Sequence, residues 1–292
     1  MKLSISNIGW TAEQDEEVYA KMRDYGFTGL EIAPTRIFPE RPYEHLREAA
    51  AWSRTMASDR GFTIPSMQSI WFGRQESLFG TQEERKALAD YTKAAIDFAE
   101  AIGCRNLVFG CPRNRNLPEN RRAELSYEGK SVDGRKREGH FPERRLTEWR
   151  FPDEAVLFFR EIGDYAAEKG TVIGMEANPP IYNTNFINRT EEALALIQKV
   201  NSPGFLLNLD VGTMVQNGEE ISVLKGEVSK INHVHISEPG LKPIQERALH
   251  RELRDLLQAE GYQNFISIEM GRTENSEELL RCMEYVSGVF RE

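Results

Sequence analysis

The feature that most constrains the fold of this chain is a regular alternation of short apolar runs with longer amphipathic stretches. The apolar runs have the length and β-branched content of buried strands, and the amphipathic stretches have the periodicity of surface helices. Five of the expected helices are followed by a glycine just before the next strand, where its tolerance of positive φ ends a helix. Eight strand–helix units in one chain predict a (β/α)8 TIM barrel rather than an open sheet.

The expected strands cover residues 3–8, 29–33, 63–69, 106–110, 172–177, 205–211, 231–237 and 265–270. The expected helices cover residues 13–25, 43–59, 82–102, 153–169, 190–199, 221–228, 244–260 and 276–290. The length of 292 residues suits one barrel domain over residues 1–292. A dinucleotide-binding sheet is disfavoured because the first turn, NIGWTAE, lacks the G-x-G-x-x-G pattern, and no P-loop motif occurs.

One interval breaks the regular spacing. About sixty residues separate the fourth expected strand from the fifth, roughly twice what one helix and its loops require. The surplus lies in residues 114–150, which are rich in Gly, Arg and Glu and have little apolar periodicity. We expect an insertion after strand four, on the catalytic face of a barrel, where it would act as a lid or substrate arm. A mobile surface excursion or a subunit contact is the alternative.

Charge and cysteine content exclude several classes of protein. The chain has 37 Lys and Arg against 46 Asp and Glu, a net charge of −9, which disfavours binding to a phosphate backbone. Three cysteines with no C-x-x-C pair do not form a disulfide framework and fit a reducing cytosol. No stretch has the apolar length of a signal peptide core or a membrane span. We therefore expect a cytoplasmic protein with no nucleic-acid partner and no membrane contact.

Ionisable residues stand at the ends of the last four expected strands, in the segments VIGMEANPP, LLNLDVGTM, INHVHISEP and FISIEMGR. They are Glu176, Asp210, His235 and Glu269, separated by 34, 25 and 34 residues. Each interval is about one strand–helix unit, so closure of a barrel would bring all four side chains to one mouth.

An inward-pointing charge without a partner costs several kcal/mol, so something positive should lie among these residues. Three carboxylates and one imidazole suit a divalent cation, with Mn²⁺ preferred and Mg²⁺, Co²⁺, Fe²⁺ or Zn²⁺ as alternatives. The competing interpretation is that an Arg, a Lys or a strand-end amide satisfies each residue separately.

The chain resembles the xylose isomerase-like barrel superfamily of sugar isomerases and epimerases, which includes ketose 3-epimerases, hydroxypyruvate isomerase and inosose dehydratase. The most specific part of the resemblance is the ordered series Glu176, Asp210, His235 and Glu269 on strands five to eight. The resemblance implies that these four residues bind one divalent metal. It also implies that Glu176 and Glu269 face each other across the substrate as an acid and base pair.

Such a site would act on a hydroxy-carbonyl compound through a metal-stabilised enediolate. Returning the proton to the same carbon gives epimerisation, returning it to the neighbouring carbon gives isomerisation, and loss of a β-hydroxyl gives dehydration. Ketose 3-epimerases carry sugar-binding Glu, His and Arg residues at offsets that fall here on Tyr182, Thr213 and Leu241. A plain free ketohexose is therefore disfavoured as the substrate.

Other residues near the expected mouth are candidates for binding a small carbohydrate, and each has an ordinary structural role as its alternative. Glu31 and Gln68 stand near the ends of strands two and three, and Trp71 would form an apolar wall. Arg113 would bind an anionic group. The remaining candidates are Asn178, His233 and Arg272, of which His233 is more typical of a hydrogen-bonded barrel residue.

Three further hypotheses remain beside the isomerase or epimerase. The first is a sugar or inositol dehydratase with the same ligands. The second is a DNA-repair endonuclease, disfavoured because the related nucleases use a histidine-rich three-metal cluster and this chain has five histidines. The third is a non-catalytic sugar-binding barrel, which would lack a tight metal. A homo-oligomer is compatible with the resemblance.

Overall fold

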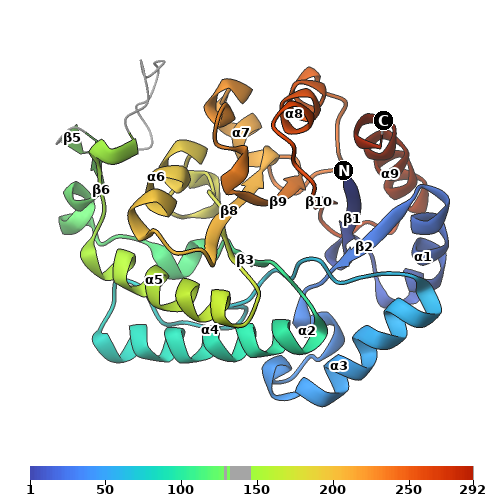
Figure 1. The fold of residues 1–292 in the computed structure, drawn as a ribbon, viewed down its shortest axis with the longest axis horizontal. Helices are drawn as coiled ribbons and strands as arrows, with labels where there is room; N and C mark the ends of the chain where they lie inside the picture. Colours follow the sequence, from blue (N-terminus) through green and yellow to red (C-terminus); the bar gives the residue numbers. More distant parts are fainter. Residues whose placement is uncertain (128–129, 132–145, 292) are drawn as a thin grey trace.

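The computed structural model describes residues 1–127, 130–131 and 146–291 of the chain. Seven parallel strands form a curled sheet with helices on its outer side (Figure 1). In spatial order they are β2 (Phe27–Glu31), β1 (Lys2–Ser6), β10 (Phe265–Ile268), β9 (Ile231–Ile236), β8 (Phe205–Asp210), β7 (Ile173–Met175) and β3 (Leu107–Phe109). The first and last strands of this sheet, β2 and β3, are joined by the segment at residues 63–67.

This joining segment occupies the place of the third expected strand. Its pairings are single bridges, from Thr63 to Gly29 and from Met67 to both Ile32 and Leu107. The prediction of a continuous strand at residues 63–69 was wrong, because Pro65 has no N–H to donate to a ladder.

The hydrogen bonds nevertheless run on both sides of the segment. The Leu30 N–H donates to the Thr63 carbonyl at 2.9 Å, and the Val108 N–H donates to the Met67 carbonyl at 2.8 Å. The sheet therefore closes on itself, and the fold is the TIM barrel that the sequence predicted.

The outer layer contains the helices α1 (Asp15–Asp24), α2 (Pro34–Ile37), α3 (Leu46–Thr55), α4 (Gln82–Ile102), α5 (Asp153–Glu168), α6 (Thr190–Val200), α7 (Val211–Asn217), α8 (Ala248–Ala259) and α9 (Ser276–Phe290). The helix α4 shows how the sequence sets their limits. The Thr81 hydroxyl accepts from the Glu84 N–H, and the Glu84 carboxylate accepts from the Thr81 N–H. Gly103, in the left-handed conformation at φ 71°, ends the helix.

One expected helix is in a different place. A helix was expected at residues 221–228, but residues 221–230 contain two short 3₁₀ turns, Ile221–Leu224 and Val228–Lys230, with Gly226 between them at φ 74°. The prediction of a helix there was wrong, because a left-handed residue interrupts the helical hydrogen bonds. The helix that follows β8 is instead α7, which begins directly after Asp210, the last residue of that strand.

The long interval after β3 contains a small antiparallel sheet of β4 (Ser126–Tyr127), β5 (Lys130–Ser131) and β6 (Trp149–Arg150). Within the predicted insertion at 114–150, residues 128–129 and 132–145 lie outside the described residues. The start of this range belongs to the barrel, because Asn114, Arg115 and Leu117 are all buried. No helix in the described ranges is both long enough and apolar enough to cross a membrane.

Candidate functional site

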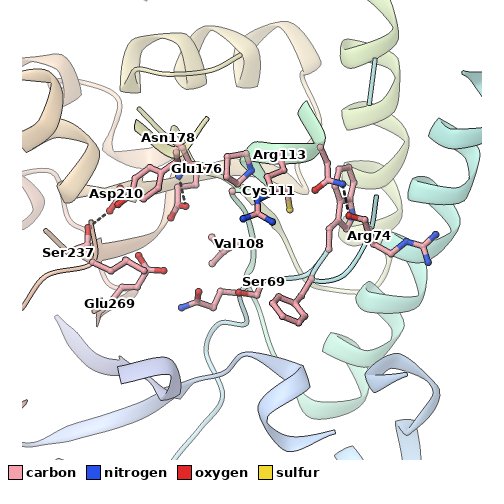
Figure 2. A pocket seen from close by; sticks show the side chains of 18 of the residues that line it. Ser69, Arg74, Val108, Cys111, Arg113, Glu176, Asn178, Asp210, Ser237 and Glu269 are labelled. Carbon is pink, nitrogen blue, oxygen red and sulfur yellow. Dashed lines mark hydrogen bonds between the residues drawn. The ribbon is translucent and has the colours of Figure 1, made fainter. Parts of the chain in front are cut away.

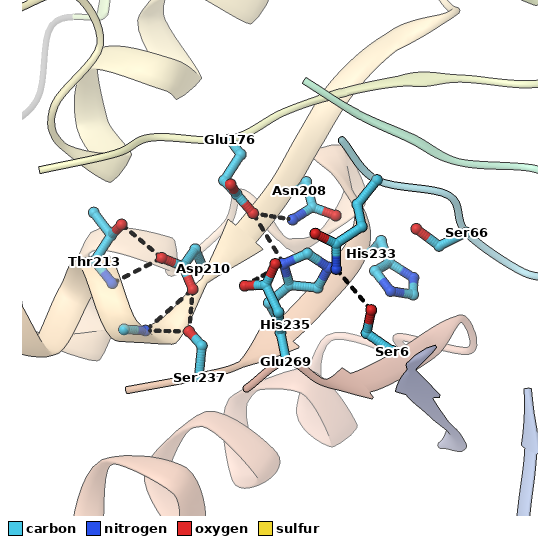
Figure 3. Close-up of polar contacts among 12 residues, drawn as sticks. Ser6, Ser66, Glu176, Asn208, Asp210, Thr213, His233, His235, Ser237 and Glu269 are labelled. Carbon is cyan, nitrogen blue, oxygen red and sulfur yellow. Dashed lines mark hydrogen bonds and ion pairs between the residues drawn. The ribbon is translucent and has the colours of Figure 1, made fainter. Parts of the chain in front are cut away.

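Four ionisable side chains meet at the carboxyl-terminal ends of the strands. Glu176 and Glu269 directly follow β7 and β10, Asp210 ends β8, and His235 lies in β9. One ligand atom from each lies within 4.8 Å of the other three, and all four residues are buried (Figure 3). The spacing of about one strand–helix unit in the sequence has thus become proximity at one mouth of the barrel.

The Glu176 carboxylate is held on both oxygens by amides. The Asn208 side chain donates to Oε1 at 2.9 Å, and the Asn178 side chain donates to Oε2 at 3.0 Å. Gly110, directly beyond β3, leaves room for this carboxylate, since a Cβ there would lie 2.9 Å from Glu176 Oε2. Asn208 was missed by the sequence reasoning, although its place two residues before Asp210 puts it on the same inward face of the strand.

Asp210 is the N-cap of α7. Its Oδ1 accepts from the Gly212 N–H at 3.2 Å and from the Ser237 hydroxyl, and its Oδ2 accepts from the Thr213 N–H at 3.0 Å. The Thr213 hydroxyl lies within hydrogen-bond distance of both Oδ2, at 2.7 Å, and the Ala177 carbonyl, at 2.8 Å. A hydroxyl has one hydrogen, so donation to Ala177 leaves a lone pair on Oδ2 free for another partner.

The His235 ring is fully buried and has carboxylates on both sides. Its Nδ1 lies 2.9 Å from Glu176 Oε1 and 3.3 Å from Glu269 Oε2, and its Nε2 lies 2.9 Å from Glu31 Oε2. Although close to two acids, Nδ1 has no hydrogen-bond partner of acceptable geometry in the described part of the chain. Burial disfavours the charged imidazolium, but Glu31 and Glu269 outweigh it and hold the pKa of His235 well above its usual value.

Crowding of acids also changes the carboxylates. Burial raises the pKa of Glu269 to about 7, with Glu176 and Asp210 adding to the rise while His235 opposes it. Burial, followed by the charge of Glu176, raises the pKa of Asp210. Both shifts express the free-energy cost of holding negative charge here, and a divalent cation among the carboxylates would offset that cost.

The donor set fits such a cation. Three carboxylates supply hard oxygen ligands, and the unpartnered Nδ1 of His235 supplies one nitrogen that already faces two of them. The residues Glu176, Asp210, His235 and Glu269 could therefore hold a divalent metal.

A cavity of about 550 Å³ opens directly above this cluster (Figure 2). Glu176, Asp210 and Glu269 lie at one end of its lining, and the loop that contains Phe72 contributes to another part. The Phe72 side chain is 71% exposed and Arg113 is also exposed. A volume of this size lies within the range of ~300–1,000 Å³ typical of small-molecule pockets.

The predicted substrate-binding residues divide into two groups. Gln68, Trp71, Arg113 and Asn178 line the cavity. Glu31, His233 and Arg272 do not line it: the first two are fully buried beneath the cluster, and Arg272 is exposed elsewhere. Burial alone would raise the pKa of Glu31, but the neighbouring His235 and His233 outweigh the effect of burial and hold the pKa of Glu31 well below its usual value.

Arg115 is a functional candidate whose place the sequence did not reveal. Arg115 follows β3 in a segment rich in polar and charged residues, a place typical of a solvated side chain, yet its side chain is fully buried. Its guanidinium donates to the Glu176 carbonyl at 2.9 Å, to Asn178 Oδ1 at 2.9 Å and to the Ile187 carbonyl at 3.4 Å. Arg115 thus fixes the loop after β7, including the amide that orients Glu176.

This fold and this site define a class of protein: TIM barrels that carry three carboxylates and an imidazole at the carboxyl-terminal ends of their strands. Residues 19–286 match the family described as xylose isomerase-like TIM barrel, and the chain belongs to that family.

Two curated relatives are similar in sequence. L-ribulose 3-epimerase of Methylomonas sp. (strain DH-1) is 37% identical over 86 residues, which are 29% of this chain and 29% of that protein. The match therefore spans less than a third of that relative. Inosose dehydratase of Clostridium perfringens (strain 13 / Type A) is 24% identical over 262 residues, covering 84% of this chain and 74% of the relative.

Solved structures share the fold at lower identity. The 3-keto-D-glucoside 4-epimerase of E. coli has a TM-score of 0.70 at 17% identity, with 99% of each chain covered. The IOLI protein, solved with a bound zinc atom, has a TM-score of 0.66 at 18% identity, with 100% of each chain covered.

Proposed function

We propose that this protein is a divalent-metal-dependent isomerase or epimerase of a keto-sugar or sugar derivative. The observation that carries the proposal is the meeting of Glu176, Asp210, His235 and Glu269 within 4.8 Å beneath an open cavity. The similarity to two epimerases, L-ribulose 3-epimerase and 3-keto-D-glucoside 4-epimerase, supports the proposal.

Glu176, Asp210, His235 and Glu269 would hold the metal. When bound, it would polarise the substrate carbonyl and stabilise the negative charge of an enediolate. Mn²⁺ is the ion we favour for three carboxylates and one imidazole, with Mg²⁺, Co²⁺, Fe²⁺ and Zn²⁺ as alternatives. The zinc atom in the IOLI structure supports a divalent ion at a site of this fold without deciding which one acts here.

Glu176 and Glu269 would exchange the proton. They project from β7 and β10, on either side of β8 and β9 in the sheet, and both line the cavity. Burial raises the pKa of Glu269 to about 7, which suits a group that both takes and returns a proton near neutral pH. Asn178 and Asn208 keep the Glu176 carboxylate in one orientation. Removal of a proton by one glutamate as a carboxylate, and delivery of a different proton by the other as a carboxylic acid, would invert the carbon between them.

The substrate would be a sugar derivative rather than a free ketohexose. Tyr182 and Leu241, at two positions that bind sugar in ketose 3-epimerases, line the cavity with different chemistry. Thr213, at the third position, donates its N–H to Asp210 instead. Gln68 and Arg113 are the polar lining groups that we propose to bind the substrate, with Trp71 as its apolar wall.

A dehydratase acting on an inosose or keto-sugar is the second candidate. The similarity to inosose dehydratase over 84% of the chain favours it, and the same four ligands and two glutamates would serve the reaction. The two candidates differ in product: a dehydratase releases one water, which mass spectrometry of the product detects, whereas an isomerase or epimerase leaves the mass unchanged.

Deuterium exchange tests the proposal. Protein stripped by a chelator and reloaded with Mn²⁺ is incubated in D₂O with a panel of keto-sugars, keto-glycosides and inososes. We expect metal-dependent deuterium incorporation at one carbon, and a loss of about 10²–10⁴-fold in Glu176→Gln and Glu269→Gln. Glu284→Gln, an exposed carboxylate on α9, is the matched control that retains full exchange. Exchange that persists without metal, or a purified protein that binds no divalent ion, would contradict the proposal.

A further inference from the structure

Glu31 is a buried carboxylate that the proposed chemistry does not use. It ends β2, its side chain is 0% exposed, and it is not part of the cavity lining. Burying an ionised carboxylate is costly unless it is paired and hydrogen-bonded, so a fully enclosed Glu beside the cluster calls for a physical reason.

The contacts of Glu31 supply that reason. Its Oε2 lies 2.9 Å from Nε2 of His235, and the opposite ring nitrogen, Nδ1, lies 2.9 Å from Glu176 Oε1 and 3.3 Å from Glu269 Oε2. The Nε2 edge of the imidazole therefore contacts Glu31, and the Nδ1 edge faces the carboxylates beneath the cavity. The Nδ1 lone pair is available to a metal only if the ring proton resides on Nε2.

We propose that Glu31 is a positioning residue that accepts the Nε2–H of His235 and thereby keeps the Nδ1 lone pair directed at the metal. The inference rests on the metal site of the proposed function. A carboxylate in this place fixes both the tautomer and the orientation of a ligating histidine, and it makes the ring a stronger donor.

The surroundings of Glu31 hold it in this orientation. The Gln68 side-chain amide donates to Glu31 Oε1 at 3.2 Å and to the Ser6 hydroxyl at 2.7 Å (Figure 3 shows Ser6). His233 Nε2 lies 3.2 Å from Oε2, the oxygen that faces His235. Glu31 thus contacts Gln68, directly after the segment that closes the barrel, and His235 in β9, and these contacts leave its side chain little freedom to turn away from His235.

Metal affinity is the readout that separates positioning from simple structural support. Purified Glu31→Gln is titrated with Mn²⁺ against a chromophoric chelator, and the Co²⁺-loaded proteins are compared by visible absorption. We expect a loss of affinity of about 10–100-fold with one ion still bound per chain, and a changed Co²⁺ spectrum. Unchanged affinity and spectrum would overturn the inference.

Glu219→Gln is the matched control. Glu219 is also a buried carboxylate, but it accepts from the Thr190 N–H and the Asn217 amide rather than from a residue of the cluster. We expect its variant to bind Mn²⁺ within about twofold of the wild type. A loss as large as that of Glu31→Gln would show that any buried carboxylate has this effect, and would overturn the inference.

Two further results keep the inference testable on the wild-type protein. If Glu31→Gln does not fold, long-range ¹H–¹⁵N spectra of the Zn²⁺-loaded wild type report the His235 tautomer. A proton on Nε2 supports the inference, and a metal-bound Nε2 overturns it. Glu31, His233 and His235 also satisfy the spacing of a second ion site, so two ions per wild-type chain would make Glu31 a ligand and overturn the positioning role. A wild type that binds no ion at all refutes the proposed function itself.

Discussion

Replacing Arg115 with methionine tests whether a buried cation holds the active-site loop. The guanidinium makes two bonds of 2.9 Å, to the Glu176 carbonyl and to Asn178 Oδ1, and a longer one of 3.4 Å to the Ile187 carbonyl. Methionine preserves much of the apolar length of the side chain but donates to none of these acceptors. The variant therefore removes the bonds while largely keeping the packing.

The expected loss of stability follows from two opposing effects. Each hydrogen bond from a charged donor contributes about 1.5–3 kcal/mol, so the two short bonds together contribute about 3–6 kcal/mol. Burial lowers the pKa of Arg115 from its ordinary value of 12.5 to about 10, which corresponds to a cost of about 3 kcal/mol for enclosing the cation. Removing the cation recovers that cost, but the two acceptors of the short bonds, the Glu176 carbonyl and Asn178 Oδ1, are left without their donor and add about 1–3 kcal/mol each. With the smallest value taken for each effect, the net loss is at least about 2 kcal/mol.

Urea unfolding of Arg115→Met and the wild type measures this difference. Arg113→Met is the matched control, since Arg113 lies two residues away on the exposed rim and its replacement should change stability by less than about 0.5 kcal/mol. We also expect slower deuterium exchange in Arg115→Met, because Asn178 no longer fixes Glu176. A stability loss below about 1 kcal/mol would refute the reasoning and show that Arg115 fills space without holding the loop.

Three other substitutions probe single contacts. Gly110→Ala places a Cβ 2.9 Å from Glu176 Oε2, so deuterium exchange should slow at least tenfold while the Tm stays unchanged. Exchange at the wild-type rate would contradict the close approach of the Glu176 carboxylate to residue 110. Ser237→Ala removes a donor to Asp210 and should weaken Mn²⁺ binding about tenfold in the chelator titration, and equal affinity would count against it. Burial lowers the pKa of His250 to about 4, below its unfolded value of about 6.5. The folded state thus loses about 3 kcal/mol relative to the unfolded state as pH falls from 6.5 to 4. Urea unfolding of His250→Gln should lack this part of the acid sensitivity, and an identical pH dependence would exclude His250 as its source.

The barrel was predictable because its signal is repeated along the whole chain. Alternating strand and helix patterns, each closed by a turn, determine a parallel barrel even when one unit is irregular. The irregular unit, residues 63–67, is held by bonds to both neighbours, which a proline-containing segment does not reveal by itself. The prediction of a helix at residues 221–228 was wrong for a local reason, because the hydrophobic pattern does not reveal that Gly226 has a positive φ.

The convergence of the four strand-end residues was predictable from two regularities. Side chains alternate between the two faces along each strand, and about one strand–helix unit separates each of these residues from the next. The contacts that support the four residues were not predictable from the sequence. Arg115 is buried because acceptors more than sixty residues further along the chain surround it. Glu31 was expected to bind sugar hydroxyls, yet the barrel turns it toward His235, 204 residues away in sequence. Contacts of this kind depend on the packed geometry, which residue spacing alone does not specify.

The charge balance of the mouth bears on the simplest competing interpretation, that an Arg or Lys satisfies each acid separately. In the described part of the chain, no Arg or Lys forms an ion pair with Glu176, Asp210 or Glu269. The basic side chain within ion-pair distance of Glu176 and Glu269 is His235. The buried cation Arg115 contacts Glu176, but it donates to the backbone carbonyl of that residue and not to its carboxylate. One imidazole does not balance three buried acids together with Glu31 on its other side, so a bound dication is the compensation that this arrangement favours.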